Sequence, residues 1–262
     1  MKRQIEIFFA SLIFYTRIPC PKNVDCSQVD INQAIRYYPL VGMIVGVISF
    51  LTYWGASWLF GNVIGVVASL AAGVLTTGAF HEDGFADAFD GFGGGWTKEK
   101  ILEIMKDSRI GTYGTIALIL LFALKFFSLC LLLPQLAKES WWILFLFFIL
   151  YHSLARLTSG NIVFTLQYAR DDLTSKVKPV EKGATQTEII ISYLFGLIPL
   201  AIFTIINPLV LIVLIPLFLL VVKGNRFFKK WIGGYTGDCL GCIEQLAELI
   251  IMLTFVAIWK FM

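Results

Sequence analysis

Long apolar stretches without a single charge constrain the fold of this chain more than any other feature. Residues 37–60 and residues 62–80 contain no Asp, Glu, Lys or Arg. The hydrocarbon core of a bilayer is about 30 Å thick and needs about 20 apolar residues per helix. Across its 262 residues the chain is 58% hydrophobic and only 15% charged, which is unlike a soluble protein. The sequence therefore predicts an all-α, polytopic membrane protein.

About seven transmembrane helices are expected. The two charge-free stretches predict a helical hairpin that turns at Gly61 and Asn62. A shorter apolar segment, residues 5–19, lacks the small-residue cleavage site of a secretory signal, and we expect it to be interfacial or re-entrant. Without repeats or linkers, residues 1–262 are expected to form one integral membrane catalytic domain. The other predicted spans are residues 113–136, 141–163, 188–206, 209–223 and 241–259.

Three polar segments separate these spans and carry most of the basic residues. They cover residues 81–112, 164–187 and 224–240, and hairpin geometry places all of them on one face of the membrane. Because basic loops stay inside the cell, this face is predicted to be cytoplasmic and to hold the catalytic loops. The net charge of +3 is too small to indicate a nucleic-acid partner. The lipid bilayer is an expected partner, and a homo-oligomer is compatible with the sequence.

The first polar segment opens with a histidine and four carboxylates. Asp83, Asp87 and Asp90 are spaced four and three residues apart, so a helix would place them on one face, with Glu82 beside them. Oxygen ligands favour hard divalent ions, and Mg²⁺ usually binds a few carboxylates together with substrate phosphates. The cluster therefore predicts Mg²⁺ as cofactor, held by Glu82, Asp83, Asp87 and Asp90, and a phosphorylated substrate. The alternative is a solvated acidic face that caps the next helix.

Other polar groups on the same face are candidates for substrate binding and catalysis. Consecutive glycines offer backbone amides to a phosphate, and an amphipathic surface helix is predicted over residues 97–111. Its end could equally be a plain salt-bridged helix terminus. Lone histidines are more often structural than catalytic. The candidates are Arg36, Gly93, Gly94, Ser108, Arg156 and Lys176 for phosphate or substrate binding, and His81, Asp107, Arg109 and Asp238 for catalysis.

Two further features concern the predicted spans. Lys125 lies near the middle of the span 113–136, where a lysine costs about 2.5 to 3.5 kcal/mol, so we expect it to face the bundle interior with a partner. Cys239 and Cys242 have zinc-knuckle spacing, but a tetrahedral site needs four ligands. A packing role is therefore favoured for this pair.

Five strings spread over the chain resemble the adenosylcobinamide-GDP ribazoletransferase family, the cobalamin synthases. They are FYTRIP at 14–19, YPLVG at 38–42, HEDGFADAFDG at 81–91, EIMKDSRIG at 103–111 and GYTGDCLG at 234–241. The loop from Lys176 to Gly183 matches the family pattern least. The resemblance implies an enzyme of the prokaryotic cytoplasmic (inner) membrane that completes the nucleotide loop of coenzyme B12.

That activity joins adenosylcobinamide-GDP to α-ribazole or its 5′-phosphate, giving adenosylcobalamin or its 5′-phosphate and GMP. On this hypothesis Mg²⁺ at the acidic cluster neutralises the pyrophosphate, and basic side chains bind the remaining phosphate charge. The base for the ribazole hydroxyl could be His81, Asp107 or Asp238.

Two other functions fit part of the sequence. Asp87-Ala-Phe-Asp-Gly91 reproduces half of the CDP-alcohol phosphotransferase motif, but the other half is absent. A cation transporter would use the carboxylates to bind an ion in transit, and Lys125 together with the proline-interrupted span is compatible with it. Most of the acidic residues lie outside the predicted spans, which disfavours transport.

Overall fold

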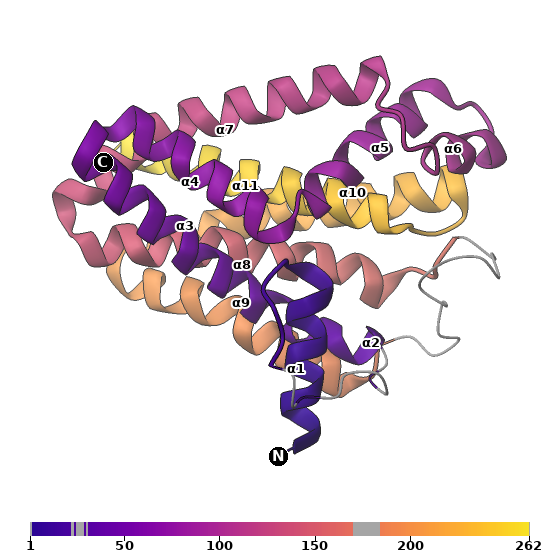
Figure 1. The fold of residues 1–262 in the computed structure, drawn as a ribbon, viewed down its shortest axis with the longest axis horizontal. Coiled ribbons are helices and arrows are strands. Elements are labelled where there is room, and N and C mark those ends of the chain that lie inside the picture. Colours follow the sequence, from indigo (N-terminus) through magenta and orange to yellow (C-terminus); the bar gives the residue numbers. More distant parts are fainter. Residues whose placement is uncertain (1, 22–23, 25–28, 30, 170–183, 262) are drawn as a thin grey trace.

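The computed structural model describes residues 2–21, 24, 29, 31–169 and 184–261, and these form helices without a strand. Figure 1 shows a bundle of long helices with a cap of short ones at one end. The elements are α1 (Lys2–Tyr15), α2 (Ile31–Ala34), η1 (Ile35–Tyr37), α3 (Tyr38–Phe60), α4 (Asn62–Thr77), α5 (Phe80–Gly94), α6 (Lys98–Ile104), α7 (Thr112–Glu139), α8 (Trp141–Thr165), α9 (Gln186–Ile206), η2 (Pro208–Val213), α10 (Leu214–Ile232) and α11 (Gly237–Lys260).

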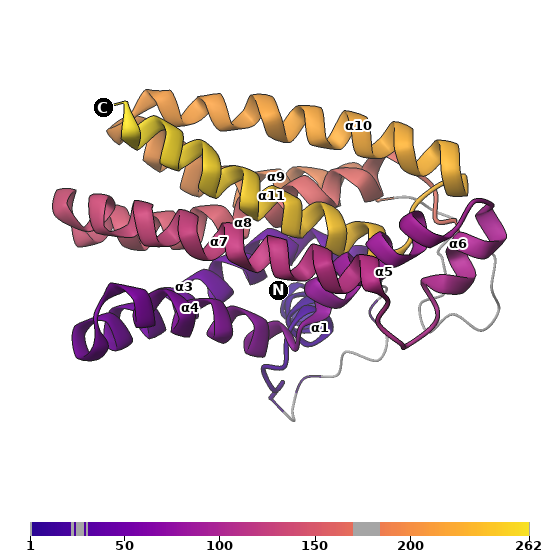
Figure 2. The same ribbon diagram turned by 90° about the horizontal axis from the view of Figure 1, so that it is seen from above.

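The all-α, multi-pass prediction is confirmed. Six helical stretches of the described chain are long and apolar enough to cross a membrane, and a seventh is added if α4 and α5 count as one span. Figure 2 shows α10 along one side of the bundle and α3 with α4 along the other, with α7, α8 and α11 between them. The turns after α3, α7 and α9 lie at the left of Figure 1, whereas α5, α6 and the α10–α11 turn lie at the right. The first and third polar segments therefore share one end of the bundle, as predicted, whereas most of the second, residues 164–187, lies outside the described residues.

Helices occupy much of the segments that were predicted as polar connections between spans. The span predicted over residues 62–80 ends at Thr77, because Gly78 and Ala79 both adopt left-handed backbone conformations, with φ of 68° and 59°. The chain bends there by 87°, and α5 runs in a new direction. At the other end of the sequence, α10 continues to Ile232 because Phe228 and Ile232 are buried against α5 and α6.

The amphipathic helix predicted over residues 97–111 is shorter than expected. Helix α6 runs from Lys98 to Ile104, and Thr97 caps its start by accepting a hydrogen bond from the amide of Lys100. Ile101 of α6 and Met105, directly after its end, are buried in the protein beside α5. This face is therefore covered by protein. The membrane position of α1 stays a prediction.

Helix α8 forms the centre of the bundle, and α3 packs on it at very short range. Gly42 and Gly46 lie one turn apart on the face of α3 that touches α8. A β-carbon at Gly46 would lie 2.5 Å from the carbonyl oxygen of Phe148, and one at Gly42 would lie 2.6 Å from Arg156 Cδ. Small residues at this spacing allow backbones to approach closely within a membrane.

Candidate active site on helix α5

Helix α5 carries the acidic string, and contacts with α3 and α11 fix its position. A hydrogen bond of 2.7 Å joins His81 Nε2 to Tyr38 Oη on α3. Helix α11 crosses α5 where two glycines meet, since a β-carbon at Gly84 would lie 3.5 Å from the α-carbon of Gly241. Because neither residue has a side chain, the two helices approach closely. This crossing sets the direction of α5 after the bend.

The four predicted metal ligands do not point the same way. Asp83 is exposed and Asp87 is half-buried, so both remain on the open side of α5. Asp90 is buried and accepts hydrogen bonds from the amides of Gly111 (2.7 Å) and Gly114 (2.9 Å), at the start of α7. Glu82 turns into the bundle, where it accepts a hydrogen bond of 3.0 Å from Gln245 Nε2. Asp90 therefore caps α7, and Glu82 anchors α5 to α11.

Helix α11 brings Asp238 to the open side of the acidic helix. Thr236 caps α11 by accepting a hydrogen bond from the amide of Cys239, and its hydroxyl donates to Asp238 Oδ2 at 3.2 Å. A β-carbon at Gly84 would lie 3.1 Å from the α-carbon of Asp238. Asp87 follows Gly84 by about one helical turn. The structure thus brings a third predicted site residue beside the α5 carboxylates.

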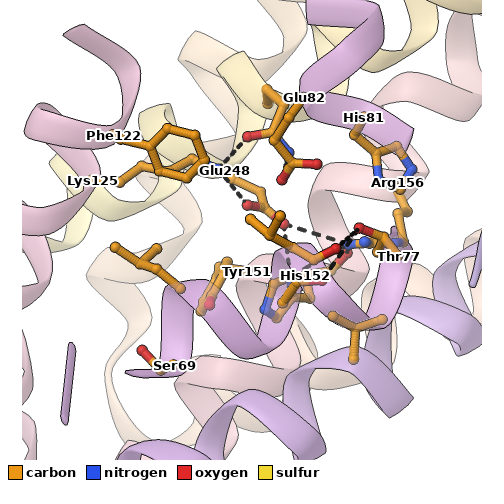
Figure 3. A pocket seen from close by; sticks show the side chains of 15 residues that line it. Ser69, Thr77, His81, Glu82, Phe122, Lys125, Tyr151, His152, Arg156 and Glu248 are labelled. Carbon is orange, nitrogen blue, oxygen red and sulfur yellow. Dashed lines mark hydrogen bonds and ion pairs between the residues drawn. The ribbon is translucent and has the colours of Figure 1, made fainter. Parts of the chain in front are cut away.

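Behind α5, the bundle encloses a cluster of paired charges (Figure 3). Glu248 on α11 lies at its centre, accepting a hydrogen bond from Lys125 Nζ at 2.7 Å and pairing with His152 Nδ1 at 2.6 Å. Arg156 Nη1 lies 2.9 Å from Glu244 and 3.5 Å from Glu248. These side chains are buried, which is tolerated in a bundle interior because each charge has an opposite partner.

Gln245 connects this cluster to the acidic helix. Its side-chain oxygen accepts a hydrogen bond from Lys125, and its amide nitrogen donates to both Glu82 and Glu244 at 3.0 Å. A polar pocket lies between these groups and α4, with Ser69 and Thr77 on its wall. The prediction that Lys125 faces the interior with a partner is confirmed, since only 2% of Lys125 is exposed.

The basic candidates for phosphate binding are mostly engaged elsewhere. Arg156 is 1% exposed and belongs to the buried cluster. Arg36 is also buried and pairs with Glu188, the capping residue of α9. Arg109 pairs with Asp107 at 2.6 Å on the exposed segment before α7. Lys176 lies outside the described residues.

The remaining candidates lie at the far end of α5. Ser108 is exposed next to the Asp107–Arg109 pair. The hydrogen bonds from Arg109 lower the pKa of Asp107 to about 2. Gly93 lies against the ring of Tyr113, since a β-carbon there would come within 2.6 Å of it, and Gly94 follows at the end of the helix. The segment that carries Asp107 and Ser108 meets α5 at Asp90, which accepts the hydrogen bond from the amide of Gly111.

Sequence reasoning missed Gln245 and Tyr38 as partners of the acidic string. A signal was present, because Glu244, Gln245 and Glu248 fall within an apolar predicted span, where buried polar groups need partners. Lys125 and Arg156 were visible in the sequence as possible cationic partners for these residues. The sequence did not indicate which helices contact one another. Cys239 and Cys242 are buried thiols, in agreement with a packing role.

The donor set on α5 is suited to Mg²⁺ only with help from a substrate. Among the residues that the structure describes, no three His, Cys, Asp or Glu side chains form a ready-made metal site. Asp83 and Asp87 nevertheless offer oxygen ligands one turn apart on the open side. Mg²⁺ commonly takes one or two carboxylates and completes its shell with water and substrate phosphates. The residues present fit that mode of binding.

Fold and site together define a multi-pass helical membrane protein that presents an acidic helix at the end of the bundle where its polar segments gather. The chain belongs to the cobalamin-5-phosphate synthase family, whose family model matches residues 7–256. A protein of Shewanella frigidimarina named adenosylcobinamide-GDP ribazoletransferase is 40% identical over 259 residues, covering 98% of this chain and 96% of that protein. Proteins of the same name from Shewanella amazonensis and Shewanella baltica are 40% and 41% identical over 99% and 95% of this chain, and 98% and 92% of their own lengths. No solved structure is significantly similar.

Proposed function

We propose that this protein joins adenosylcobinamide-GDP to α-ribazole or its 5′-phosphate, releasing GMP and completing a cobalamin. The family match over residues 7–256 carries the proposal, because it spans the acidic helix and the whole bundle. Relatives that cover nearly the full chain bear the name of this activity. The CDP-alcohol phosphotransferase and transporter alternatives have no such support, and Lys125, which left transport open, is paired with Glu248.

In this reaction the ribazole hydroxyl oxygen attacks the phosphorus that is bonded to cobinamide. A new P–O bond forms, the P–O bond to GMP breaks, and the hydroxyl proton passes to a base. Asp83 and Asp87 would hold Mg²⁺, which when bound neutralises negative charge on the pyrophosphate. Asp238, beside α5 on the open side, is the base that the geometry favours, since His81 is buried against Tyr38.

The acidic helix is proposed to face the cytoplasm of a prokaryotic cell, from the inner membrane. The basic residues of the polar segments support this orientation through the positive-inside rule. The cytoplasm also supplies the nucleotides from which the GDP part of the substrate is made. A homo-oligomer remains compatible with this arrangement.

The activity can be tested with protein purified in detergent. Adenosylcobinamide-GDP and α-ribazole 5′-phosphate are mixed with the enzyme in Mg²⁺ or in EDTA, and GMP and the corrinoid product are followed by chromatography. We expect both products with Mg²⁺ and neither with EDTA. Wild-type protein that released no GMP under any condition would refute the proposal.

Three substitutions separate metal binding from helix capping. Asp83→Ala and Asp87→Ala should lower turnover by about 100-fold or more without changing thermal stability, as expected when charge stabilisation is lost. Asp90→Ala should destabilise the protein by about 1 to 2 kcal/mol, because two amides at the start of α7 lose their acceptor. If Asp87→Ala released GMP at the wild-type rate, the proposed metal site would be wrong.

A further inference from the structure

An arginine from the segment that follows α1 lies at the bend between α4 and α5. The backbone amide of Arg17 donates a hydrogen bond of 2.7 Å to the carbonyl oxygen of Thr76. Its side chain then lies directly over Gly78, where a β-carbon would come within 3.0 Å of Arg17 Cγ. Two aromatic residues just before Arg17 fix this segment, because the rings of Phe14 and Tyr15 pack against Phe80 at the start of α5.

The guanidinium of Arg17 is not committed to an acidic partner. Arg17 is exposed, and no carboxylate of the described residues forms an ion pair with it. The three arginines that the sequence nominated are different, because Arg36, Arg109 and Arg156 are each paired with a glutamate or aspartate. Within the part of the chain that the structure describes, Arg17 is thus the unpaired arginine nearest to the start of the acidic helix.

Its position matches the charge that the proposed reaction must bind. Two residues after Gly78 the acidic helix begins, and Asp83 faces the open side about one turn later. A pyrophosphate diester held at Asp83 and Asp87 through Mg²⁺ retains oxygens that need further donors. An arginine presents several N–H donors in a planar fork that matches phosphate oxygens.

We propose that Arg17 binds the pyrophosphate of the nucleotide substrate at the open side of α5. This role rests on the proposed function and adds a substrate-binding residue to it. The glycine at position 78 then has two uses, since it permits the left-handed turn and leaves room for the arginine stem. The competing role is purely structural, in which Arg17 only covers the end of α4.

Substrate affinity and stability separate the two roles. For full-length wild type, Arg17→Gln and Arg17→Lys in detergent with Mg²⁺, one measures kcat, the KM for adenosylcobinamide-GDP, the KM for ribazole phosphate and the melting temperature. We expect Arg17→Gln to raise the KM for adenosylcobinamide-GDP about tenfold, the usual effect of one charge-assisted hydrogen bond. The other KM and the melting temperature should stay near wild type. Arg17→Lys should be intermediate, because it keeps the charge without the fork.

Lys138→Gln is the matched control, because Lys138 is an exposed cation at the opposite end of the bundle. Its KM should equal that of wild type. An unchanged KM in Arg17→Gln would overturn the proposal, as would a lower melting temperature accompanied by a lower kcat at constant KM.

A second probe keeps this test independent of turnover. Inorganic pyrophosphate with Mg²⁺ is titrated into wild type and Arg17→Gln, and its dissociation constant should rise about tenfold in the variant. If wild type released no GMP, the proposed function would fail, and this titration would still decide whether Arg17 binds pyrophosphate.

Discussion

Adjacent residues of the acidic string have different tasks. Glu82 reaches into the bundle to Gln245, whereas Asp83 remains exposed on the open side. Successive helical residues point about 100° apart, so a single string can serve both the interior and the substrate. Three candidate bases follow the same division, because His81 is buried, Asp107 is paired with Arg109, and Asp238 lies beside α5.

Asp107 and Asp238 should differ sharply as bases. The pKa of Asp107 is lowered to about 2 by hydrogen bonds from Arg109, so its carboxylate keeps its charge until the pH falls through about 2 and is a weak proton acceptor. Asp107→Asn should therefore leave the acidic limb of the pH–rate profile unchanged. Asp238→Asn should lower kcat by about 100-fold or more, the usual contribution of a general base. Equal losses in the two variants, measured between pH 5 and 9, would contradict this assignment.

Lys125 should be essential to stability rather than to chemistry alone. Removing one partner of a buried ion pair weakens the compensation of the remaining charge, and breaking such a pair costs about 3 to 5 kcal/mol. Lys125→Met should accordingly lower the melting temperature in detergent, because Glu248 keeps its burial and loses a cation. Lys138→Met, on the exposed end of the same helix, is the control and should change stability by less than about 0.5 kcal/mol. Equal melting temperatures for the two variants would contradict this interpretation.

At the scale of elements, the α3–α8 contact illustrates how close packing supports the buried cluster. Arg156 and His152 belong to α8, and Gly42 lets α3 approach to the backbone of His152. The close approach brings Tyr38, at the start of α3, within 5.8 Å of the Arg156 guanidinium. The packing of α3 on α8 thus positions Tyr38, which forms a hydrogen bond with His81 on α5.

Two glycines of α3 should respond in opposite ways to alanine. A β-carbon at Gly46 would meet backbone atoms of α8 at 2.5 to 2.9 Å, and backbone cannot rotate away, so Gly46→Ala should cost about 1 to 3 kcal/mol. At Gly55 a β-carbon would meet nothing within 4 Å, and Gly55→Ala should be neutral or slightly stabilising. Thermal unfolding of both variants checks the pair. A stable Gly46→Ala protein would show that the contact can relax.

For the whole molecule, the sequence predicted the spans better than their ends. Long apolar runs located α3, α7 and α8 because the bilayer demands them, and loop order placed the first and third polar segments at one end. The bend at Gly78 and Ala79 was missed, since Ala79 adopts a left-handed conformation that alanine rarely takes and that only tertiary packing sustains.

The site was predictable in its residues and not in its contacts. The acidic string indicated Asp83 and Asp87 directly. That Asp90 caps α7 depends on a contact 21 residues away, and that Arg156 is buried depends on Glu244 of another helix. Single-sequence spacing carries no information on such long-range pairing.

Labelling from either side of the membrane should reveal the orientation of the bundle. Helix α7 has exposed residues at both ends, Ser108 just before it and Lys138 near its end. In a background with the native cysteines replaced by serine, Lys138→Cys should react with an impermeant maleimide in intact spheroplasts. Ser108→Cys should react only after the membrane is opened. The reverse pattern would place the acidic helix outside the cytoplasm.

The length of α4 has a consequence for the membrane around the acidic helix. With 16 residues it is about 24 Å long, shorter than the hydrocarbon core, whereas the 28 residues of neighbouring α7 reach about 42 Å. A short span makes the bilayer beside it thin, so that headgroups and water move inward. We therefore expect Asp83 to lie recessed below the surrounding lipid surface yet in contact with water, so that a nucleotide approaching from this side would enter the membrane plane without leaving water.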